Sequence, residues 1–177
     1  TSVSRGLGDV YKRQILPSTD ASETGKEFCE NKKVRKLTFT GSTEVGRVLL
    51  GQAAKNVLKC SMELGGNAPF IVFDDADLDD AVQGAIMCKF RNNGQTCVCA
   101  NRIYVQTGVY KEFAAKLQKA VSKLKVGDGF DPETTLGPLI SLNAVKKVNS
   151  HIDDAISKGA EPIYCSTYSQ EAGNFIN

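Results

Sequence analysis

The sequence predicts an α/β fold with a parallel sheet. Segments with helical spacing of apolar residues alternate with short apolar or β-branched runs, the order expected when helices connect parallel strands. Of the 177 residues, 41% are hydrophobic and 24% are charged, which is ordinary for a globular chain. No apolar run reaches the roughly 18 residues that span a bilayer. The net charge of +2 is too balanced to favour nucleic acid or an anionic membrane, so we expect neither as a partner.

The first predicted elements are a short helix, a strand and a longer helix. The short helix covers residues 20–31, with Asp20 or Ser22 as its N-cap. Residues 35–40 form a β-rich run that a glycine ends. Residues 43–58 have helical periodicity, and we expect one apolar stripe of this helix to be buried, namely Val45, Val48, Leu49, Ala53 and Val57.

The middle of the chain repeats this alternation. Residues 69–73 are continuously apolar, which is typical of a strand buried on both faces. Asp77 is placed to cap a helix over residues 77–90, and the apolar residues on one side of that helix are Leu78, Val82, Ala85, Ile86 and Phe90. A strand over residues 101–106 and an amphipathic helix over residues 109–124 follow.

The last third of the chain is predicted to be a loop, a helix and a strand. The loop over residues 127–138 is rich in Gly and Pro, and the helix over residues 142–158 ends at Gly159 in the capping position. Residues 161–165 are expected to form the last strand. Because the composition changes little along the chain, the best domain break is the Gly65–Gly66 turn, where glycine reaches backbone conformations closed to other residues.

The cysteines do not predict a metal site. The six are Cys29, Cys60, Cys88, Cys97, Cys99 and Cys165, and they lack the paired CxxC spacing of structural zinc sites. His151 is the one histidine, and it lies within a predicted helix where packing is a sufficient role. No secretory signal peptide opens the sequence, so we expect free thiols in the cytoplasm or the mitochondrial matrix rather than secretion.

Three polar segments are candidates for chemistry. An activated thiol at Cys97 can attack an electrophilic carbon, and Glu63, just before two glycines, is well placed for a general base. The FTGSTEVG turn over residues 39–46 leads from a strand into a helix N-terminus, where phosphate binds readily. Plainer interpretations are open for all three: a space-filling cysteine, a solvated surface acid and a simple helix cap.

Taken together, these segments resemble one family in order and spacing. The series FTGSTxxG, ELGG and GQxC is similar to the motifs of the aldehyde dehydrogenase superfamily, and Glu63 and Cys97 lie 34 residues apart, as in that family. The resemblance runs from about residue 15 to the C-terminus. It implies an incomplete aldehyde dehydrogenase fold, with the end of the cofactor domain over residues 15–66 and the first part of the catalytic domain over residues 67–177. We expect residues 1–14 to be disordered or foreign to the domain.

The resemblance also implies a mechanism and a cofactor. Cys97 would attack the aldehyde carbon, hydride would pass to NAD or NADP, and Glu63 would activate the water that hydrolyses the thioester. No metal is implied. The residues that would contact the cofactor are Gly41 and Ser42 at the phosphates, Val45 at the adenine and the Leu64 backbone at the nicotinamide.

Two further segments look most like the succinate-semialdehyde branch of the superfamily. They are KFRN over residues 89–92 and CVCAN over residues 97–101. This likeness implies that Arg91 binds the distal carboxylate of the substrate, the alternative being a solvated charge at a helix end. A disulfide between Cys97 and Cys99 would act as an oxidative off-switch, the alternative being that Cys99 is a small core residue.

The implied activity belongs to a longer protein. That protein would be an NAD(P)-dependent oxidoreductase for succinate semialdehyde and a homo-oligomer, either a tetramer or a dimer. Glutarate semialdehyde, other aldehydes and a non-catalytic remnant are the alternatives. Because both domain cores would be incomplete, we expect the 177-residue chain alone to be inactive, poorly folded or both.

Overall fold

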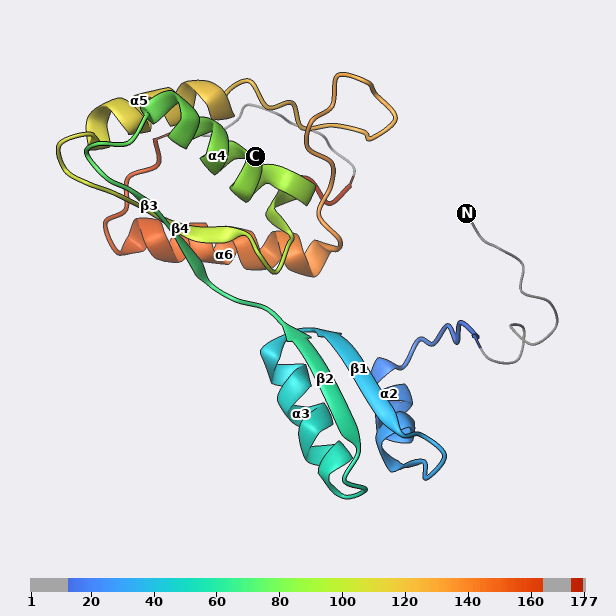
Figure 1. The fold of residues 1–177 in the computed structure, drawn as a ribbon. Helices are drawn as coiled ribbons and strands as arrows, with labels where there is room; N and C mark the ends of the chain where they lie inside the picture. The colour runs from blue at the N-terminus through green and yellow to red at the C-terminus, as the bar shows by residue number, and fades with distance from the viewer. Residues whose placement is uncertain (1–12, 164–172, 177) are drawn as a thin grey trace. The chain divides into compact units, whose positions relative to one another are not determined.

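The computed structural model describes residues 13–163 and 173–176, and it divides into two compact units after Leu64 (Figure 1). Each unit contains a two-stranded parallel sheet with helices packed against it. The predicted α/β class with parallel strands is therefore confirmed. The assignment of residues 15–66 to a cofactor domain and of residues 67–177 to a catalytic domain stays a prediction.

The first unit alternates helices and strands. Helix α2 (Ala21–Glu30) has Asp20 as its N-cap, which decides between the two predicted caps. Strand β1 (Lys36–Gly41) leads into helix α3 (Thr43–Ala54), and strand β2 (Lys59–Leu64) then pairs in parallel with β1. The chain thus forms a βαβ unit preceded by a helix.

The core of the first unit lies on one face of its sheet. Cys29 of α2 and Leu49 and Ala53 of α3 are buried there. The strand residues packed against them occupy alternate positions, which face the same side of a sheet: Leu37, Phe39, Cys60 and Met62. Both helices therefore cover the same face.

Three features of this unit differ from the predictions. Strand β2 was not expected, although its sequence KCSMEL alternates polar and apolar residues with the period of a strand. The predicted helix over residues 43–58 ends earlier, at Ala54, and the chain reverses through Val57, which has a φ of 49° and is 91% exposed. Val45 and Val48 are also exposed, by 46% and 58%, because they face a groove rather than the core.

The second unit has a strand–helix–strand order followed by two more helices. Asp77 caps the first helix through backbone N–H groups of Asp79 and Asp80, as the sequence predicts. Figure 1 shows α4 and α5 on one side of the strands and α6 on the other. The elements are β3 (Ala68–Val72), α4 (Leu78–Phe90), the short 3-10 segment η1 (Arg91–Gly94), β4 (Ala100–Val105), α5 (Tyr110–Val121) and α6 (Leu142–Ser157).

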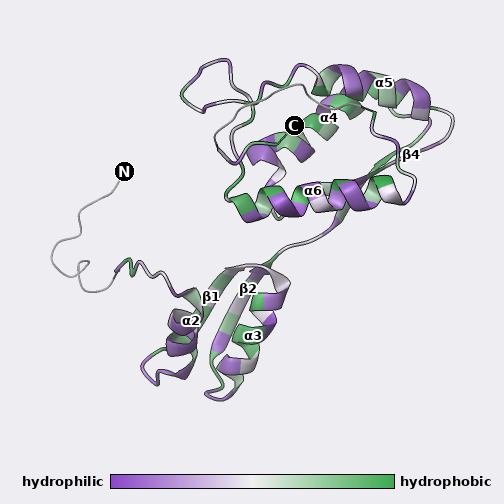
Figure 2. Cartoon of the chain, turned by 180° about the vertical axis from the view of Figure 1, so that it is seen from behind, coloured by the Kyte–Doolittle hydropathy of each residue, from purple (hydrophilic) through white to green (hydrophobic). Residues whose placement is uncertain are grey.

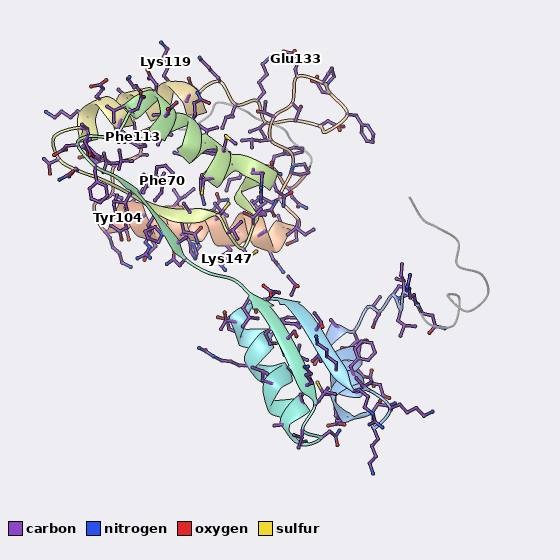
Figure 3. All side chains as sticks on the ribbon, in the orientation of Figure 1. Phe70, Tyr104, Phe113, Lys119, Glu133 and Lys147 are labelled. Atoms are coloured by element: carbon purple, nitrogen blue, oxygen red, sulfur yellow. The ribbon has the colours of Figure 1, made fainter. Side chains whose placement is uncertain are left out.

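The core of the second unit lies between the strands and helices α4 and α5. It is formed by Val72, Val82, Ala85 and Phe113, with Phe70 packed against them (Figure 3). Hydrophobic and hydrophilic residues alternate along α5 and α6, as expected of amphipathic helices (Figure 2). Among the described helices, none is long and apolar enough to cross a membrane.

Three expectations for the second unit need correction. Residues 69–73 are not buried on both faces, because the Val72 side is covered while Ile71 on the other side is 55% exposed. The predicted strand over residues 161–165 does not begin at Glu161, and its last two residues lie outside the described residues. Gly65 and Gly66 do not use the positive φ angles that only glycine adopts easily.

Candidate active site

The candidate nucleophile, Cys97, lies in the connection from α4 to β4 and is exposed. Its loop enters the amino-terminal end of β4, beside the start of β3, because the two strands are parallel and Ala68 pairs with Ala100. Ligands of open α/β sheets bind beyond the carboxyl ends of the strands. Cys97 lies at the opposite end of β4, so its role as a nucleophile depends on its own surroundings.

The backbone ahead of Cys97 turns through three consecutive left-handed residues. The φ angles are 51° at Asn92, 57° at Asn93 and 72° at Gly94. Asn and Gly are the residues that adopt this conformation at least cost, which explains the NNG sequence. Non-glycine residues held in this conformation concentrate at functional sites. The turn was not predicted, although the NNG run is a signal for it in the sequence.

The start of β4 and the carbonyl of Cys97 lie beside residues 66 and 67, which precede β3 in the second unit. Asn101 donates its side-chain N–H to the Gly66 carbonyl at 3.2 Å, and Arg102 donates to the Asn67 carbonyl at 2.8 Å. A Cβ built on Gly66 would lie 3.7 Å from the carbonyl oxygen of Cys97. Residues 66 and 67 therefore lie beside the candidate nucleophile, two positions after Leu64.

Arg91 occupies the C-cap position of α4 and is exposed. Within the described residues, its guanidinium has no hydrogen bond or ion pair. A guanidinium without a protein partner remains available to a carboxylate, for which its paired N–H groups are suited.

Cys99 differs from Cys97 in its surroundings. It is 1% exposed, its thiol donates to the Cys88 carbonyl at 3.1 Å, and it accepts a hydrogen bond from the Thr96 hydroxyl at 2.9 Å. A disulfide with Cys97 would require the thiol of Cys99 to leave these contacts. Of the cysteines that the structure describes, all five are free thiols.

The candidate cofactor residues meet at the carboxyl ends of the two strands of the first sheet, which we call one edge of that sheet. In the register of β1 and β2, Gly41 pairs with Leu64, and Glu63 lies one position earlier on the same edge. Ser42 then caps α3 by accepting the Val45 N–H at 3.3 Å. This edge is the carboxyl end of the strands, where ligands bind in open α/β sheets.

Close packing explains why the last residue of the FTGSTEVG motif, Gly46, is a glycine. It is buried, and a Cβ built on it would lie 2.7 Å from a methyl group of Leu64. A side chain at this position would displace Leu64. This role of Gly46 was not predicted, and the position of the glycine within the motif is the signal for it in the sequence.

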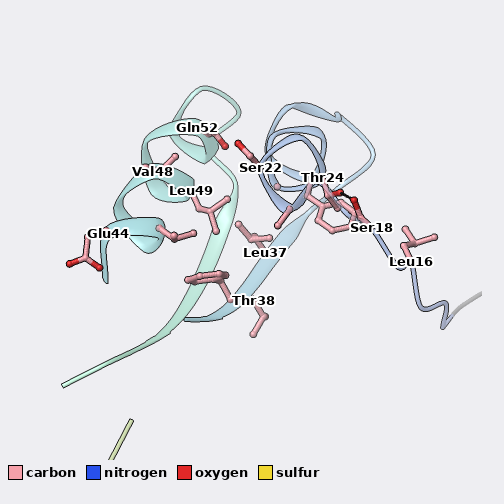
Figure 4. A pocket seen from close by; sticks show the side chains of 15 residues that line it. Leu16, Ser18, Ser22, Thr24, Leu37, Thr38, Glu44, Val48, Leu49 and Gln52 are labelled. Atoms are coloured by element: carbon pink, nitrogen blue, oxygen red, sulfur yellow. Dashed lines mark hydrogen bonds between the residues drawn. The ribbon is translucent and has the colours of Figure 1, made fainter. Parts of the chain in front are cut away.

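A groove of about 680 Å³ lies between α2, β1 and α3 (Figure 4). Val45 and Val48 form part of its wall on the side of α3, and Ser22 and Phe28 form part of the opposite wall on α2. The groove is mostly apolar and open to solvent, so it has the form of a cleft for a flat apolar group.

Cys29 is a buried cysteine of the core, in contrast to the exposed Cys97. It is fully buried beneath the groove, and burial, followed by the nearby Cys60 and Glu30, raises the pKa of its thiol. A raised pKa keeps the thiol neutral and unreactive. Among the described residues no cluster of three or more His, Cys, Asp or Glu could hold a metal ion.

Comparison with known proteins identifies the family. Residues 14–177 match the aldehyde dehydrogenase family. The chain belongs to this family. The NADP(+)-dependent succinate-semialdehyde dehydrogenase GabD of Escherichia coli is 61% identical over 156 residues, which cover 88% of this chain and 32% of that protein. The glutarate-semialdehyde dehydrogenase of Pseudomonas putida is 66% identical over 141 residues, covering 80% of this chain and 29% of that one.

Solved structures of the family share the fold. The crystal structure of succinate-semialdehyde dehydrogenase from Burkholderia pseudomallei is 56% identical, with a TM-score of 0.87, and the match covers 92% of this chain and 33% of that one. The chain thus spans about a third of the length of the aldehyde dehydrogenases that it matches. The predicted resemblance to this family is confirmed.

Proposed function

We propose that this chain is the catalytic middle of an NAD(P)-dependent dehydrogenase that oxidises succinate semialdehyde to succinate. The observation that carries the proposal is the exposed thiol of Cys97, which follows a turn of three left-handed residues and whose carbonyl lies beside Gly66. Membership of the aldehyde dehydrogenase family supports the reaction type. The similarity to a succinate-semialdehyde dehydrogenase and to a glutarate-semialdehyde dehydrogenase supports a semialdehyde as the substrate.

The first unit offers a fitting site for the cofactor. Gly41 has no side chain at the end of β1, and the N-terminus of α3 presents backbone N–H groups and a positive dipole end to phosphate. Val45 and Val48 would offer an apolar wall to the adenine. The backbone of Leu64, which pairs with Gly41 at the ends of the strands, would contact the nicotinamide. When bound, NAD or NADP supplies the hydride acceptor of the reaction.

Cys97 would form and release the covalent intermediate. Its thiolate attacks the aldehyde carbon, which forms a C–S bond and places the negative charge on the former carbonyl oxygen. The backbone N–H of Cys97 is one donor for this oxyanion. After the carbon has lost hydride, the product is a thioester on Cys97.

Glu63 would complete the cycle as general base. It takes a proton from water, the hydroxide adds to the thioester carbon, and the C–S bond breaks to release the acid and the thiolate. This role for Glu63 is supported by the ELGG motif of residues 63–66 and by membership of the aldehyde dehydrogenase family.

The proposal is tested on the complete protein that contains this chain. We expect production of NADH or NADPH from succinate semialdehyde, followed by absorbance, to be abolished by Cys97→Ala. In Glu63→Gln we expect one rapid turnover and then very slow release of product. Full steady-state activity in Cys97→Ala would overturn the proposal. Running each reaction with both cofactors decides between NAD and NADP.

Glutarate semialdehyde is the alternative substrate, favoured by the similarity to the glutarate-semialdehyde dehydrogenase of Pseudomonas putida. Both semialdehydes carry a distal carboxylate that the unpaired Arg91 suits, and they differ by one methylene. The ratio of kcat/KM for the two substrates on the complete protein decides between them. We also expect the complete protein to be a homo-oligomer, either a dimer or a tetramer, which sedimentation can measure.

A further inference from the structure

The left-handed turn ahead of Cys97 is braced by a distant part of the second unit. The side-chain amide of Asn93 donates to the Pro138 carbonyl at 3.2 Å and accepts the Gly137 N–H at 3.0 Å. The Asn93 side chain therefore donates one hydrogen bond to the backbone of this segment and accepts one from it, as a neighbouring strand would. Gln95 adds a third bond, because its side-chain oxygen accepts the Ile140 N–H at 3.2 Å.

These bonds join segments about 45 residues apart in the chain. Residues 137–140 immediately precede α6, whose N-cap is Ser141, so the loop of Cys97 is fastened to the start of a regular helix. Asn93 lies outside the buried core cluster of this unit. Its loss would therefore free the loop without removing core packing.

We propose that Asn93 is a positioning residue, which fixes the approach of the Cys97 thiol to the aldehyde carbon through its two hydrogen bonds to residues 137 and 138. The inference rests on the proposed function of Cys97. An amide is required because it both donates and accepts. Aspartate can accept from the Gly137 N–H but cannot donate to the Pro138 carbonyl, and it would place two oxygens against each other.

Two variants separate the effect of the brace, meaning the two hydrogen bonds of Asn93 to residues 137 and 138, from the effect of its left-handed backbone. Asn93→Gly removes the brace and leaves a residue that adopts a φ of 57° without strain. Asn93→Asp keeps the size of the side chain and loses one of the two bonds. The matched control is Gln118→Ala, because the Gln118 amide also donates to a carbonyl 45 residues away, that of Ile163, from α5 rather than from this loop.

The experiment uses the complete protein and measures three quantities for each variant. These are kcat and KM for aldehyde oxidation, the rate at which iodoacetamide alkylates Cys97, and the melting temperature. We expect Asn93→Gly and Asn93→Asp to lower kcat by about 10- to 100-fold, the size expected when a reacting group is misplaced by about 1 Å. The KM for the cofactor, the alkylation rate and the melting temperature should stay near their wild-type values, since the thiol remains exposed and the core intact.

Gln118→Ala should keep the wild-type kcat. A wild-type kcat in both Asn93 variants would overturn the inference. A fall in kcat that a lower melting temperature explains would also overturn the inference, because less of the protein would then be folded in the assay. Failure of the proposed function is seen separately, as activity that survives Cys97→Ala.

Discussion

At the scale of single residues, we expect Arg91 to decide which aldehyde the proposed site prefers. Its guanidinium has no partner in the described part of the chain, and it lies six residues before Cys97. Charge at this position would attract a carboxylated substrate and orient it through two parallel hydrogen bonds. A neutral aldehyde would gain nothing from it.

We therefore expect Arg91→Ala to act selectively. In the complete protein it should lower kcat/KM for succinate semialdehyde by about 30-fold or more, since truncating one partner of a desolvated ion pair costs about 2 kcal/mol or more. Butanal, which lacks the carboxylate, should be oxidised almost as well as by the wild type. The matched control is Lys111→Ala, which removes an exposed cation from α5. Equal losses for both aldehydes would exclude the substrate role.

Cys99 carries a prediction about oxidation. Its thiol is buried against the Cys88 carbonyl, so a disulfide with Cys97 forms only when this part of the loop opens. If the pair is a switch, peroxide inactivation of the complete protein should be reversed by dithiothreitol in the wild type and not in Cys99→Ala. Cys60→Ala, a thiol of the first unit, should behave like the wild type. Equal recovery in Cys99→Ala and the wild type would leave Cys99 as a core residue.

At the scale of elements, helix α5 contributes Phe113 to the buried core of the second unit, with Leu117 and Ala120 packed against that core. Phe113 is 2% exposed and completes the core with Val72, Val82 and Ala85. Phe113→Ala should lower the free energy of unfolding by about 3–5 kcal/mol, the usual cost of removing a buried phenyl ring. Tyr110→Ala on the same helix should cost far less, because Tyr110 is 51% exposed. Urea denaturation of the complete protein measures both, and equal losses would contradict this account of the core.

Local signals in the sequence predicted most of the elements. Capping by Asp20 and Asp77 and the stop at Gly159, with its φ of 91°, are decided by residues within a few positions of each other. The early end of α3 and the exposure of Ile71 depend on which elements pack against them. The spacing of apolar residues in the sequence does not contain this information. Period-two alternation in β2 is a local signal that predicts a strand over residues 59–64.

In the candidate site too, the predicted features are local in the sequence and the missed ones depend on the fold. Cys97, Glu63 and Arg91 were found from short motifs and a family resemblance, since each motif is contiguous in the chain. The brace from Asn93 to residues 137 and 138 could not be predicted, because it joins segments that only the fold brings together. The NNG run predicts a left-handed turn but not its partner.

At the scale of the whole molecule, each unit has a sheet of only two strands and exposes large apolar side chains. Ile71, Val48 and Ile156 are each about half exposed, and Ile140 is 85% exposed. Apolar surface of this kind is normally covered in a stable protein. The chain spans about a third of the length of the aldehyde dehydrogenases that it matches.

We accordingly expect the 177-residue chain by itself to melt without a cooperative transition and to produce no NADH or NADPH from succinate semialdehyde. Differential scanning calorimetry and the absorbance assay measure the two properties. The complete protein, assayed beside it, is the positive control. A sharp melting transition together with turnover by the chain alone would contradict the expectation.

The most direct test of the account is to trap the acyl group on the proposed nucleophile. The Glu63→Gln variant of the complete protein is mixed with succinate semialdehyde and NAD or NADP, quenched in acid and analysed by peptide mass spectrometry. We predict a succinyl thioester on the sulfur of Cys97, formed with one equivalent of reduced cofactor. Reduced cofactor produced with the acyl group on a different residue, or with Cys97 unmodified throughout turnover, would contradict it.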